Sequence, residues 1–376
     1  MANHKSLHLA LLAPEFPPQL GGMAELARGL AEGLAARDEV QVFTLKAHRG
    51  GSPLVAPTPL SGQPAVDAAR LRELEGSFDA FLLMNAGLTP LAGQLRKPCF
   101  GYWHGNDFLE PWLACGPAWL EGLKRPYAAR IRHGLRRWAV ARNARHLRHL
   151  FTNSRQTAAL ILSRMGMNEN DVTVVPPGVG AAFFQPRERP DDPRLRLLTV
   201  SRLSQYTRRK NVDGVLEAIA LLGQGADIFY TIVGDGDDRA RLEGKAKELG
   251  IAAKVAFRGA LGQEDLLRTY READLFILAS KASKTDVEGF GIVYIEAAAS
   301  GLPSMCSREG GATDAVVDGK NGMLIESSSP AAIAAGIHRF LGRRGELHED
   351  KVRAFAEPFR WPKISAELRA HLAAKL

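Results

Sequence analysis

The sequence predicts an α/β protein with two domains, and three observations support this prediction. Its 376 residues are enough for two domains of ordinary size, each with its own hydrophobic core. Short apolar runs that fit buried parallel strands alternate with segments whose apolar residues recur at helical spacing. A polar, proline-rich stretch at residues 187–193 interrupts this alternation, which then starts again. We therefore expect a first domain over residues 1–186, a second over residues 187–355, and a C-terminal helical segment at residues 356–376.

Composition and charge narrow the class of protein. Hydrophobic residues make up 45% of the chain and charged residues 24%, which is typical of soluble globular proteins. No apolar run is long enough to span a membrane, and the first residues lead into a strand without the features of a signal peptide. The three cysteines, Cys99, Cys115 and Cys306, are odd in number and far apart, so they predict neither a disulfide framework nor a metal site. We expect a cytoplasmic protein.

The first domain opens with a strand, a helix and a second strand, a unit that is right-handed when its strands are parallel. Helical periodicity predicts the helix at residues 23–36 and another at residues 156–165. Gly21 and Gly22 stand just before the first helix, where the backbone either turns sharply or approaches a ligand closely. The expected strands of this domain are residues 7–13, 40–45, 81–85, 99–103, 150–154 and 172–175.

A histidine follows the predicted strand at residues 99–103, in the order Trp103-His104-Gly105-Asn106-Asp107. An isolated histidine in such a place is most often structural. Ligands of open α/β sheets, however, bind at the carboxyl ends of the strands. His104 is therefore a candidate site residue, and both interpretations remain open on the residues alone.

A basic loop follows the first strand of the second domain. Arg202 stands directly after that strand, and Lys210 precedes a helix predicted at residues 212–222. A planar guanidinium and a mobile ammonium suit a diphosphate, although a solvated basic loop is the simpler alternative. Arg208 or Arg209 could take the place of Lys210. The expected strands of this domain are residues 195–201, 229–233, 255–259, 275–279, 303–306 and 324–325.

The most informative stretch is residues 286–303, which follows the strand predicted at residues 275–279. A loop with two glycines leads into a short helix over residues 292–299, and the start of a helix offers free backbone N–H groups to an anion. Glu288 and Glu296 flank this place and could hold hydroxyl groups, or Glu288 could simply complement the helix dipole. The candidate phosphate-binding positions are Phe290, Gly291, Ile292 and Val293.

The segment Gly234-Asp-Gly-Asp-Asp238 offers two interpretations. Asp235 and Asp237 have the spacing of a carboxylate pair that holds a divalent cation on a diphosphate. Glycine and aspartate are also ordinary turn residues after a strand. We favour the turn.

Glu288 and Glu296 occur in the pattern E-G-F-G-x-x-x-x-E-A-x-A-x-G-x-P, which resembles the donor-site signature of the retaining GT-B glycosyltransferases of family 4. The proline- and glycine-rich loop at residues 17–22, the segment at residues 104–107 and the Arg202 and Lys210 pair resemble further motifs of this family. The resemblance covers nearly the whole chain. It implies two Rossmann-like domains facing each other across a cleft, with the final helix crossing back to the first domain.

The resemblance also implies roles for the candidate residues. Arg202 and Lys210 would hold the pyrophosphate, Glu288 the sugar hydroxyls and Glu296 the ribose hydroxyls. His104 would lie near the transferred sugar from the other domain. Gly21 and Gly22 would contact the donor phosphates or the acceptor, and backbone groups near Arg258 would meet the base. No metal or other cofactor is expected, because basic side chains and a helix N-terminus would replace the cation.

The activity implied is transfer of a sugar, with retention, from a nucleotide-sugar to a hydroxyl acceptor in glycan, polysaccharide or glycolipid biosynthesis. We favour a UDP-sugar as the donor, with a GDP-sugar next. Two alternatives are a sugar-nucleotide epimerase, which needs no acceptor, and a non-catalytic homologue that binds a nucleotide-sugar. A dinucleotide-dependent oxidoreductase is disfavoured, since no G-x-G-x-x-G follows the first strand.

The net charge of +8 is distributed unevenly. Between Lys124 and Arg148 there are nine basic residues and no acidic residue, and Ile131, Leu135 and Trp138 recur at helical spacing. This predicts an amphipathic helix with a strongly basic face. The helix is either a solvated surface or a contact for anionic lipid, which would place the protein at the inner face of the plasma membrane. Nucleic acid is the least favoured partner, because no nucleic-acid-binding motif accompanies the charge.

Overall fold

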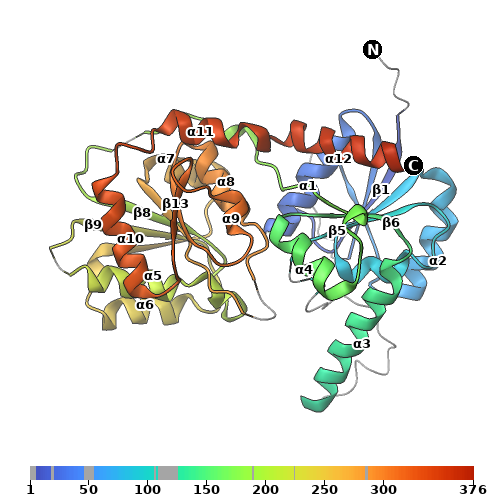
Figure 1. Ribbon diagram of the computed structural model, residues 1–376, viewed down its shortest axis with the longest axis horizontal. Coiled ribbons are helices and arrows are strands. Elements are labelled where there is room, and N and C mark those ends of the chain that lie inside the picture. Colours follow the sequence, from blue (N-terminus) through green and yellow to red (C-terminus); the bar gives the residue numbers. More distant parts are fainter. Residues whose placement is uncertain are drawn as a thin grey trace. The chain divides into compact units, whose positions relative to one another are not determined.

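A computed structural model describes residues 6–17, 21–45, 55–105, 107–108, 126–188, 190–223, 225–283 and 287–376, with side chains of Pro64 and residues 126–133 left out. The chain divides into two compact units, coloured along the sequence in Figure 1. Unit 1 comprises Met1–Gly178 and Trp361–Leu376, and unit 2 comprises Val179–Arg360. The division thus falls at Gly178, against an expected domain end at residue 186, and the last helix belongs to unit 1.

Unit 1 contains a seven-stranded parallel sheet in the order β3-β2-β1-β4-β5-β6-β7. The six strands expected from the sequence are all present. The edge strand β3 was not expected, because its sequence Pro-Thr-Pro lacks the ordinary features of a strand, but prolines are tolerated at a sheet edge. The strands are β1 His8–Ala13, β2 Glu39–Thr44, β3 Pro57–Pro59, β4 Ala80–Leu83, β5 Cys99–Trp103, β6 Leu147–Thr152 and β7 Val172–Val174.

Helices cover this sheet, and the last helix of the chain completes its core. Alanine-size side chains would overlap the Trp361 ring at Gly29 and the Ser365 side chain at Gly33, so these glycines let α12 approach α1 closely. Arg369 of α12 also pairs with the buried carboxylate of Asp38 at 2.8 Å. The helices of unit 1 are α1 Gly22–Ala35, α2 Pro64–Leu74, α3 Pro126–Ala144, α4 Arg155–Met165 and α12 Trp361–Lys375.

Unit 2 contains a six-stranded parallel sheet in the order β10-β9-β8-β11-β12-β13. Its strands are β8 Leu195–Val200, β9 Ile228–Val233, β10 Val255–Gly259, β11 Leu275–Ile277, β12 Ser304–Ser307 and β13 Gly322–Ile325. Its helices are α5 Val212–Leu221, α6 Arg239–Glu248, α7 Gln263–Glu272, α8 Ile292–Ala299, α9 Ala312–Ala315, α10 Pro330–Gly342 and α11 Glu349–Ala356.

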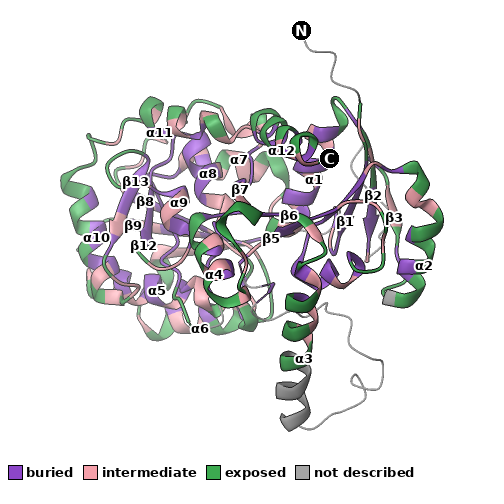
Figure 2. Ribbon diagram, turned by 45° about the vertical axis from the view of Figure 1, so that its right-hand side comes forward, coloured by how far each residue is buried: buried purple, intermediate pink, exposed green. Residues whose placement is uncertain are grey.

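Both sheets are buried on their two faces, as parallel sheets require, and Figure 2 shows their strands largely in the colour of buried residues. In β8, Leu197 packs into the cluster on one face, whereas Leu198 packs into the cluster on the other. The strand order of unit 2 reverses at β8, which lies between β9 and β11. The loops after β8 and β11 therefore flank a topological switch point, the usual place of a ligand in such sheets.

Candidate functional site

The basic loop after β8 is a rigid structure held by its own polar residues. It contains the 3₁₀ helix η6 Gln205–Lys210, whose first turn is closed by a capping box between Ser204 and Thr207. The Thr207 hydroxyl also donates to the carbonyl of Arg202 at 2.8 Å. Arg202 itself is exposed at the start of this loop, two residues after the end of β8.

Asn211 holds the end of this loop against two other segments. It is the only non-glycine residue with positive φ among the described residues, at φ 59°, and it is buried. Its amide nitrogen donates to the carbonyl of Ala279 at 3.0 Å and to that of Ser328 at 2.8 Å. Since Asn211 follows Lys210 directly, these bonds fix where the basic side chains leave the backbone.

The loop after β11 brings a buried carboxylate to the same place. Glu288 has a relative exposure of 6%, and its backbone carbonyl accepts a hydrogen bond from Gly311 N at 2.7 Å. Gly310 has φ 76°, and a Cβ there would lie 3.0 Å from the Glu288 carbonyl oxygen. The two glycines at residues 310–311 thus allow the following strand's loop to close against Glu288.

Glu288 forms a compact ionic cluster with two residues of the basic loop. Its Oε2 accepts from Arg209 at 3.0 Å, from Lys210, and from the Ser280 hydroxyl at 3.3 Å. Burial by itself raises the pKa of Glu288, but the charges and hydrogen bonds of Lys210 and Arg209 outweigh burial and lower this pKa to about 2. The carboxylate is therefore ionised at neutral pH, and the three charged groups together carry one net positive charge.

The structure resolves which basic residue stands beside Lys210. Arg209 joins Lys210 at Glu288, whereas Arg208 points to Asp238 and pairs with it at 2.6 Å. Arg209 was an alternative to Lys210 from the sequence, and the structure brings both residues to Glu288. Ser280, Asn211 and Gly310 were not expected at the site, because their contacts join loops that are far apart in the sequence.

The short helix α8 begins beside the cluster. Its N-cap is Gly291 with φ 83°, where a Cβ would lie 2.5 Å from the Tyr294 ring. Ile292 and Val293 are half-buried, and they lie in the first turn of α8, where backbone N–H groups have no acceptor within the helix and are available to an anion. The Phe290 side chain is buried 6.0 Å from the Phe359 ring, so only its backbone can serve a ligand.

Glu296 lies within α8, in the second turn of the helix. It is half-buried, and its Oε2 accepts a hydrogen bond from the hydroxyl of Tyr270 at 2.7 Å. Burial and the neighbouring Glu296 charge raise the pKa of Tyr270, so its hydroxyl stays a donor. The tyrosine orients the carboxylate and leaves acceptor positions for other groups.

The two aspartates of the turn after β9 each accept a hydrogen bond from a backbone N–H group. Asp235 accepts from Gly236 N at 2.8 Å, and Asp237 accepts from Gln205 N at 3.0 Å. The segment forms a turn after β9, as favoured from the sequence, and the bond from Gln205 joins this turn to the basic loop. Arg258 is exposed on the edge strand β10, where backbone groups are accessible.

In unit 1, His104 stands at the carboxyl end of β5. Its Nε2 lies 2.6 Å from the carbonyl oxygen of Met84, which requires a proton on Nε2 and leaves Nδ1 as the second ring nitrogen. Asp107 is buried and accepts from the backbone of His104 and of Ala86, both at 2.9 Å. Burial raises the pKa of Asp107, and the carboxyl acts as a support for this loop.

Gly21 and Gly22 precede and begin α1 as expected, and Gly21 is its N-cap. Residues 18–20 of the preceding loop lie outside the described residues.

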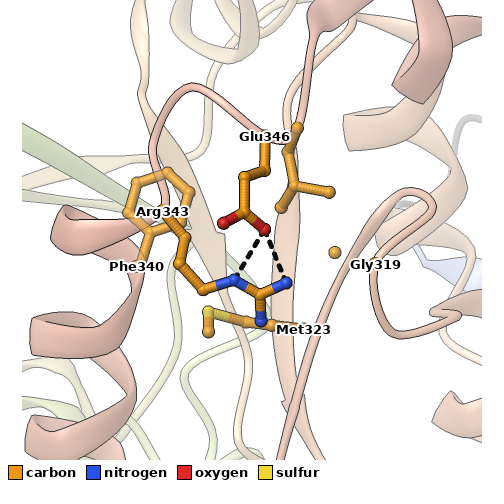
Figure 3. A pocket seen from close by; sticks show the side chains of 7 residues that line it. Gly319, Met323, Phe340, Arg343 and Glu346 are labelled. Atoms are coloured by element: carbon orange, nitrogen blue, oxygen red, sulfur yellow. Dashed lines mark hydrogen bonds and ion pairs between the residues drawn. The ribbon is translucent and has the colours of Figure 1, made fainter.

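A separate pocket lies elsewhere in unit 2, between the end of α10 and the turn before β13 (Figure 3). Arg343 and Glu346 form an ion pair at 2.6 Å beside it, and Met323 and Phe340 line it. None of the candidate residues lines this pocket.

Comparison with known proteins gives consistent results for both parts of the chain. Residues 182–355 match the family described as Glycosyl transferases group 1, and residues 20–183 match Glycosyltransferase Family 4. The chain is 28% identical, over 93% of its length and 91% of the relative's, to a GDP-mannose-dependent alpha-(1-6)-phosphatidylinositol monomannoside mannosyltransferase of Mycolicibacterium smegmatis. It is also 28% identical, over 96% of its length and 88% of the relative's, to a D-inositol 3-phosphate glycosyltransferase of Streptomyces scabiei.

Solved structures show the same fold. HepE of Anabaena in complex with UDP superposes with a TM-score of 0.75 at 18% identity, covering 98% of this chain and all of that chain. The lipopolysaccharide outer core galactosyltransferase WaaB superposes with a TM-score of 0.72 at 17% identity, with the same coverage of both chains.

Proposed function

Because the chain belongs to family 4 of the glycosyltransferases and has their GT-B fold, we propose that this glycosyltransferase moves a sugar from a nucleoside-diphosphate sugar to a hydroxyl acceptor with retention of anomeric configuration. The observation that supports it best is the cluster of Arg209, Lys210 and Glu288 next to the N-terminus of α8. It places positive charge and free backbone N–H groups beside an ionised carboxylate.

The positive groups suit the leaving diphosphate. Arg202, Arg209 and Lys210, with the N–H groups at the start of α8, would stabilise the negative charge that grows on the diphosphate as the sugar leaves. In the unliganded protein Glu288 neutralises part of this charge. A bound diphosphate shares Lys210 and Arg209 with Glu288, and the net positive charge of the cluster favours its binding.

Glu288 suits the sugar rather than a proton transfer. With a pKa of about 2 it is ionised at neutral pH and can only accept hydrogen bonds. We propose that it orients sugar hydroxyls and that Glu296 holds the ribose hydroxyls. No side chain acts as a covalent nucleophile in this scheme: the acceptor attacks from the face that the diphosphate leaves, and the departing phosphate takes the acceptor proton.

Two nucleotide-sugar classes are candidates for the donor, and the observations favour different ones. The sequence favoured a UDP-sugar, and HepE was solved with UDP. The mycobacterial relative, however, is a GDP-mannose-dependent enzyme, and it aligns with nearly the whole chain. We therefore propose GDP-mannose as the first donor to test and UDP-sugars as the second, with an inositol-containing or glycolipid hydroxyl as the acceptor class.

The experiment is a transfer assay with GDP-mannose, UDP-glucose and UDP-N-acetylglucosamine, each with phosphatidylinositol and inositol 3-phosphate as acceptors. Proton NMR of the product gives its anomeric configuration, and parallel reactions contain EDTA. An α-linked product from an α-linked donor supports the proposal. An inverted product would contradict retention, and an epimerised nucleotide-sugar without transfer would contradict the whole assignment.

We also propose that α3 contacts an anionic membrane surface. The helix is attached to unit 1 by its buried Val140 and Ala144. Leu135 and Trp138, by contrast, are 39% and 58% exposed, so these two of the three apolar residues expected on one face leave much of their surface accessible, and the side chain of Ile131 lies outside the description. The exposed arginines described on α3 are Arg137 and Arg142, and Arg145 and Arg148, also exposed, follow the helix.

This combination suits the boundary between lipid headgroups and acyl chains. Exposed Trp and Leu insert at the interface, and arginine attracts anionic headgroups. The Arg142 guanidinium lies 5.1 Å from the Trp138 ring centroid, which keeps the charge next to the aromatic ring. Lys124 and Arg125 lie outside the described residues. Within those residues, no helix is both long and apolar enough to cross a bilayer.

Vesicle co-sedimentation tests this contact. We expect binding to vesicles containing phosphatidylinositol and phosphatidylglycerol but not to pure phosphatidylcholine, and loss of binding in Leu135→Ala/Trp138→Ala. Leu341→Ala, which alters an exposed leucine of α10, is the matched control. Equal sedimentation of the double variant and the control would show that α3 is only a solvated surface.

A further inference from the structure

The turn after β9, residues 234–239, contacts two distant parts of the candidate nucleotide site. Toward the basic loop, Asp237 accepts from Gln205 N at 3.0 Å and Asp238 pairs with Arg208 at 2.6 Å. Two backbone hydrogen bonds of 2.9 Å also join the turn to this loop. Leu203 N donates to the Asp235 carbonyl, and Asp238 N donates to the Leu203 carbonyl. Side chains and backbone of the turn thus both hold the loop.

Glycines make this contact as close as the backbone allows. Gly236 and Gly234 have φ values of 152° and 126°. A Cβ on Gly236 would overlap the Leu203 carbonyl, and a Cβ on Gly234 would overlap the Ser201 carbonyl. The turn therefore fits directly against the segment that carries Arg202, without space for a side chain between them.

The other side of the same turn holds the edge strand β10. Gly234 N donates to the Gly259 carbonyl at 2.8 Å, and the Arg239 guanidinium donates to the Phe257 carbonyl at 3.2 Å. These two carbonyls flank Arg258, the place expected to meet the base. One short segment is therefore bonded to both the strand edge for the base and the loop for the diphosphate.

We infer that residues 234–239 form a brace that fixes the distance between the base-binding edge and the diphosphate-binding loop, with Asp237, Asp238 and Arg239 as positioning residues. A nucleoside diphosphate is one ligand of limited length, so both of its ends bind well only when these two places keep their spacing. The inference rests on the proposed function, and it gives the aspartates of the turn a role that needs no metal ion.

The experiment compares a nucleoside with its diphosphate. Affinities of guanosine, GDP, uridine and UDP are measured by NMR titration or calorimetry for the wild type, Asp237→Ala, Asp238→Asn and Arg239→Ala. Asp350→Ala, an exposed aspartate that pairs with Arg353 on α11, is the control. The pair of ligands that binds the wild type is the one used for the variants.

We expect Asp237→Ala to lose roughly 5- to 10-fold in affinity for the diphosphate, the net effect of one ordinary hydrogen bond, and to keep its affinity for the nucleoside. Asp238→Asn should show the same pattern. Arg239→Ala should lose affinity for both ligands, because it acts at the base end. A general loss of folding would lower both affinities in all three variants together with their melting temperatures.

The outcomes separate the two levels of the proposal. If the wild type binds neither diphosphate, the proposed function fails, and the brace fails with it. If the wild type binds but Asp237→Ala and Asp238→Asn keep full diphosphate affinity, only the brace is wrong. The brace is also wrong if all variants lose affinity for both ligands equally and have lower melting temperatures. It is wrong as well if EDTA abolishes wild-type binding and Mg²⁺ restores it, since the aspartates would then hold a metal.

Discussion

Replacement of Glu288 by glutamine removes the charge from the ionic cluster and keeps the shape of the side chain. The pKa of this carboxyl is about 2, against an ordinary value of 4.5. At 1.36 kcal/mol for each pKa unit, ionisation of Glu288 stabilises the folded protein by roughly 3 kcal/mol at neutral pH. The Glu288→Gln variant lacks this contribution, and it leaves Arg209 and Lys210 largely buried without their counter-charge. We therefore expect its free energy of unfolding to be lower by about 3 kcal/mol at pH 7.

The stability difference between wild type and Glu288→Gln should depend on pH. The pKa of Glu288 is lower in the folded protein than in the unfolded chain, so the stabilisation is complete above about pH 4.5 and is lost as the pH falls toward 2. The difference in unfolding free energy between wild type and Glu288→Gln should be constant from pH 7 to pH 5.5. It should narrow below pH 4.5 by up to about 1.4 kcal/mol per pH unit.

Urea unfolding followed by circular dichroism at pH 7, 6, 5, 4 and 3.5 measures this difference directly. Nucleotide binding and turnover should respond in opposite directions. In the variant Lys210 and Arg209 no longer pair with a carboxylate, so GDP or UDP should stabilise it at least as much as the wild type. Turnover should be slower, because the activation barrier should rise by about 2–4 kcal/mol. A stability difference that stays constant to pH 3.5, or turnover within about twofold of wild type, would refute the assignment of Glu288.

Three further predictions concern single positions. Arg209→Met and Lys210→Met should each raise the transfer barrier by about 2–4 kcal/mol, while Arg258→Met, whose backbone rather than side chain is expected to meet the base, should stay within about twofold in kcat/KM. Gly310→Ala, at φ 76° beside the Glu288 carbonyl, should lower the free energy of unfolding by roughly 1–3 kcal/mol. Nucleotide should raise the melting temperature of this variant less than that of the wild type, and an unchanged melting temperature without nucleotide would speak against the close approach. Trp361→Ala should cost about 3–5 kcal/mol in urea unfolding, because its ring fills the space next to Gly29 and Gly178.

Local sequence patterns predicted much of the fold and the place of the site. The strand, the loop with two glycines and the short helix at residues 275–299 were expected and are present, because each depends on neighbouring residues. The same holds for Arg202, which follows the end of its strand by two residues. The edge strand β3 was missed because Pro57 and Pro59 suit a strand only when one side of it lacks a partner.

The partners of the basic residues could not be predicted, because they are set by the tertiary fold. Arg208, Arg209 and Lys210 are adjacent in the sequence, yet one pairs with Asp238 on the turn after β9 and the other two with Glu288 after β11. Phe290 likewise lies in the glycine loop, but its ring enters the core against Phe359. Such outcomes depend on which loops the sheet order brings together.

The position of α12 has a consequence for how the protein is made. Its residues 361–375 are synthesised after the rest of unit 1 and after unit 2, but they fill the surface of α1, which is made much earlier. Until then the gap beside Gly29 has no indole to occupy it, and Asp38 has no guanidinium partner. Unit 2, whose residues form one continuous segment, can mature during translation. Unit 1 reaches its final form only after residues 361–375 have been made, so it stays unfinished while the whole of unit 2 is synthesised.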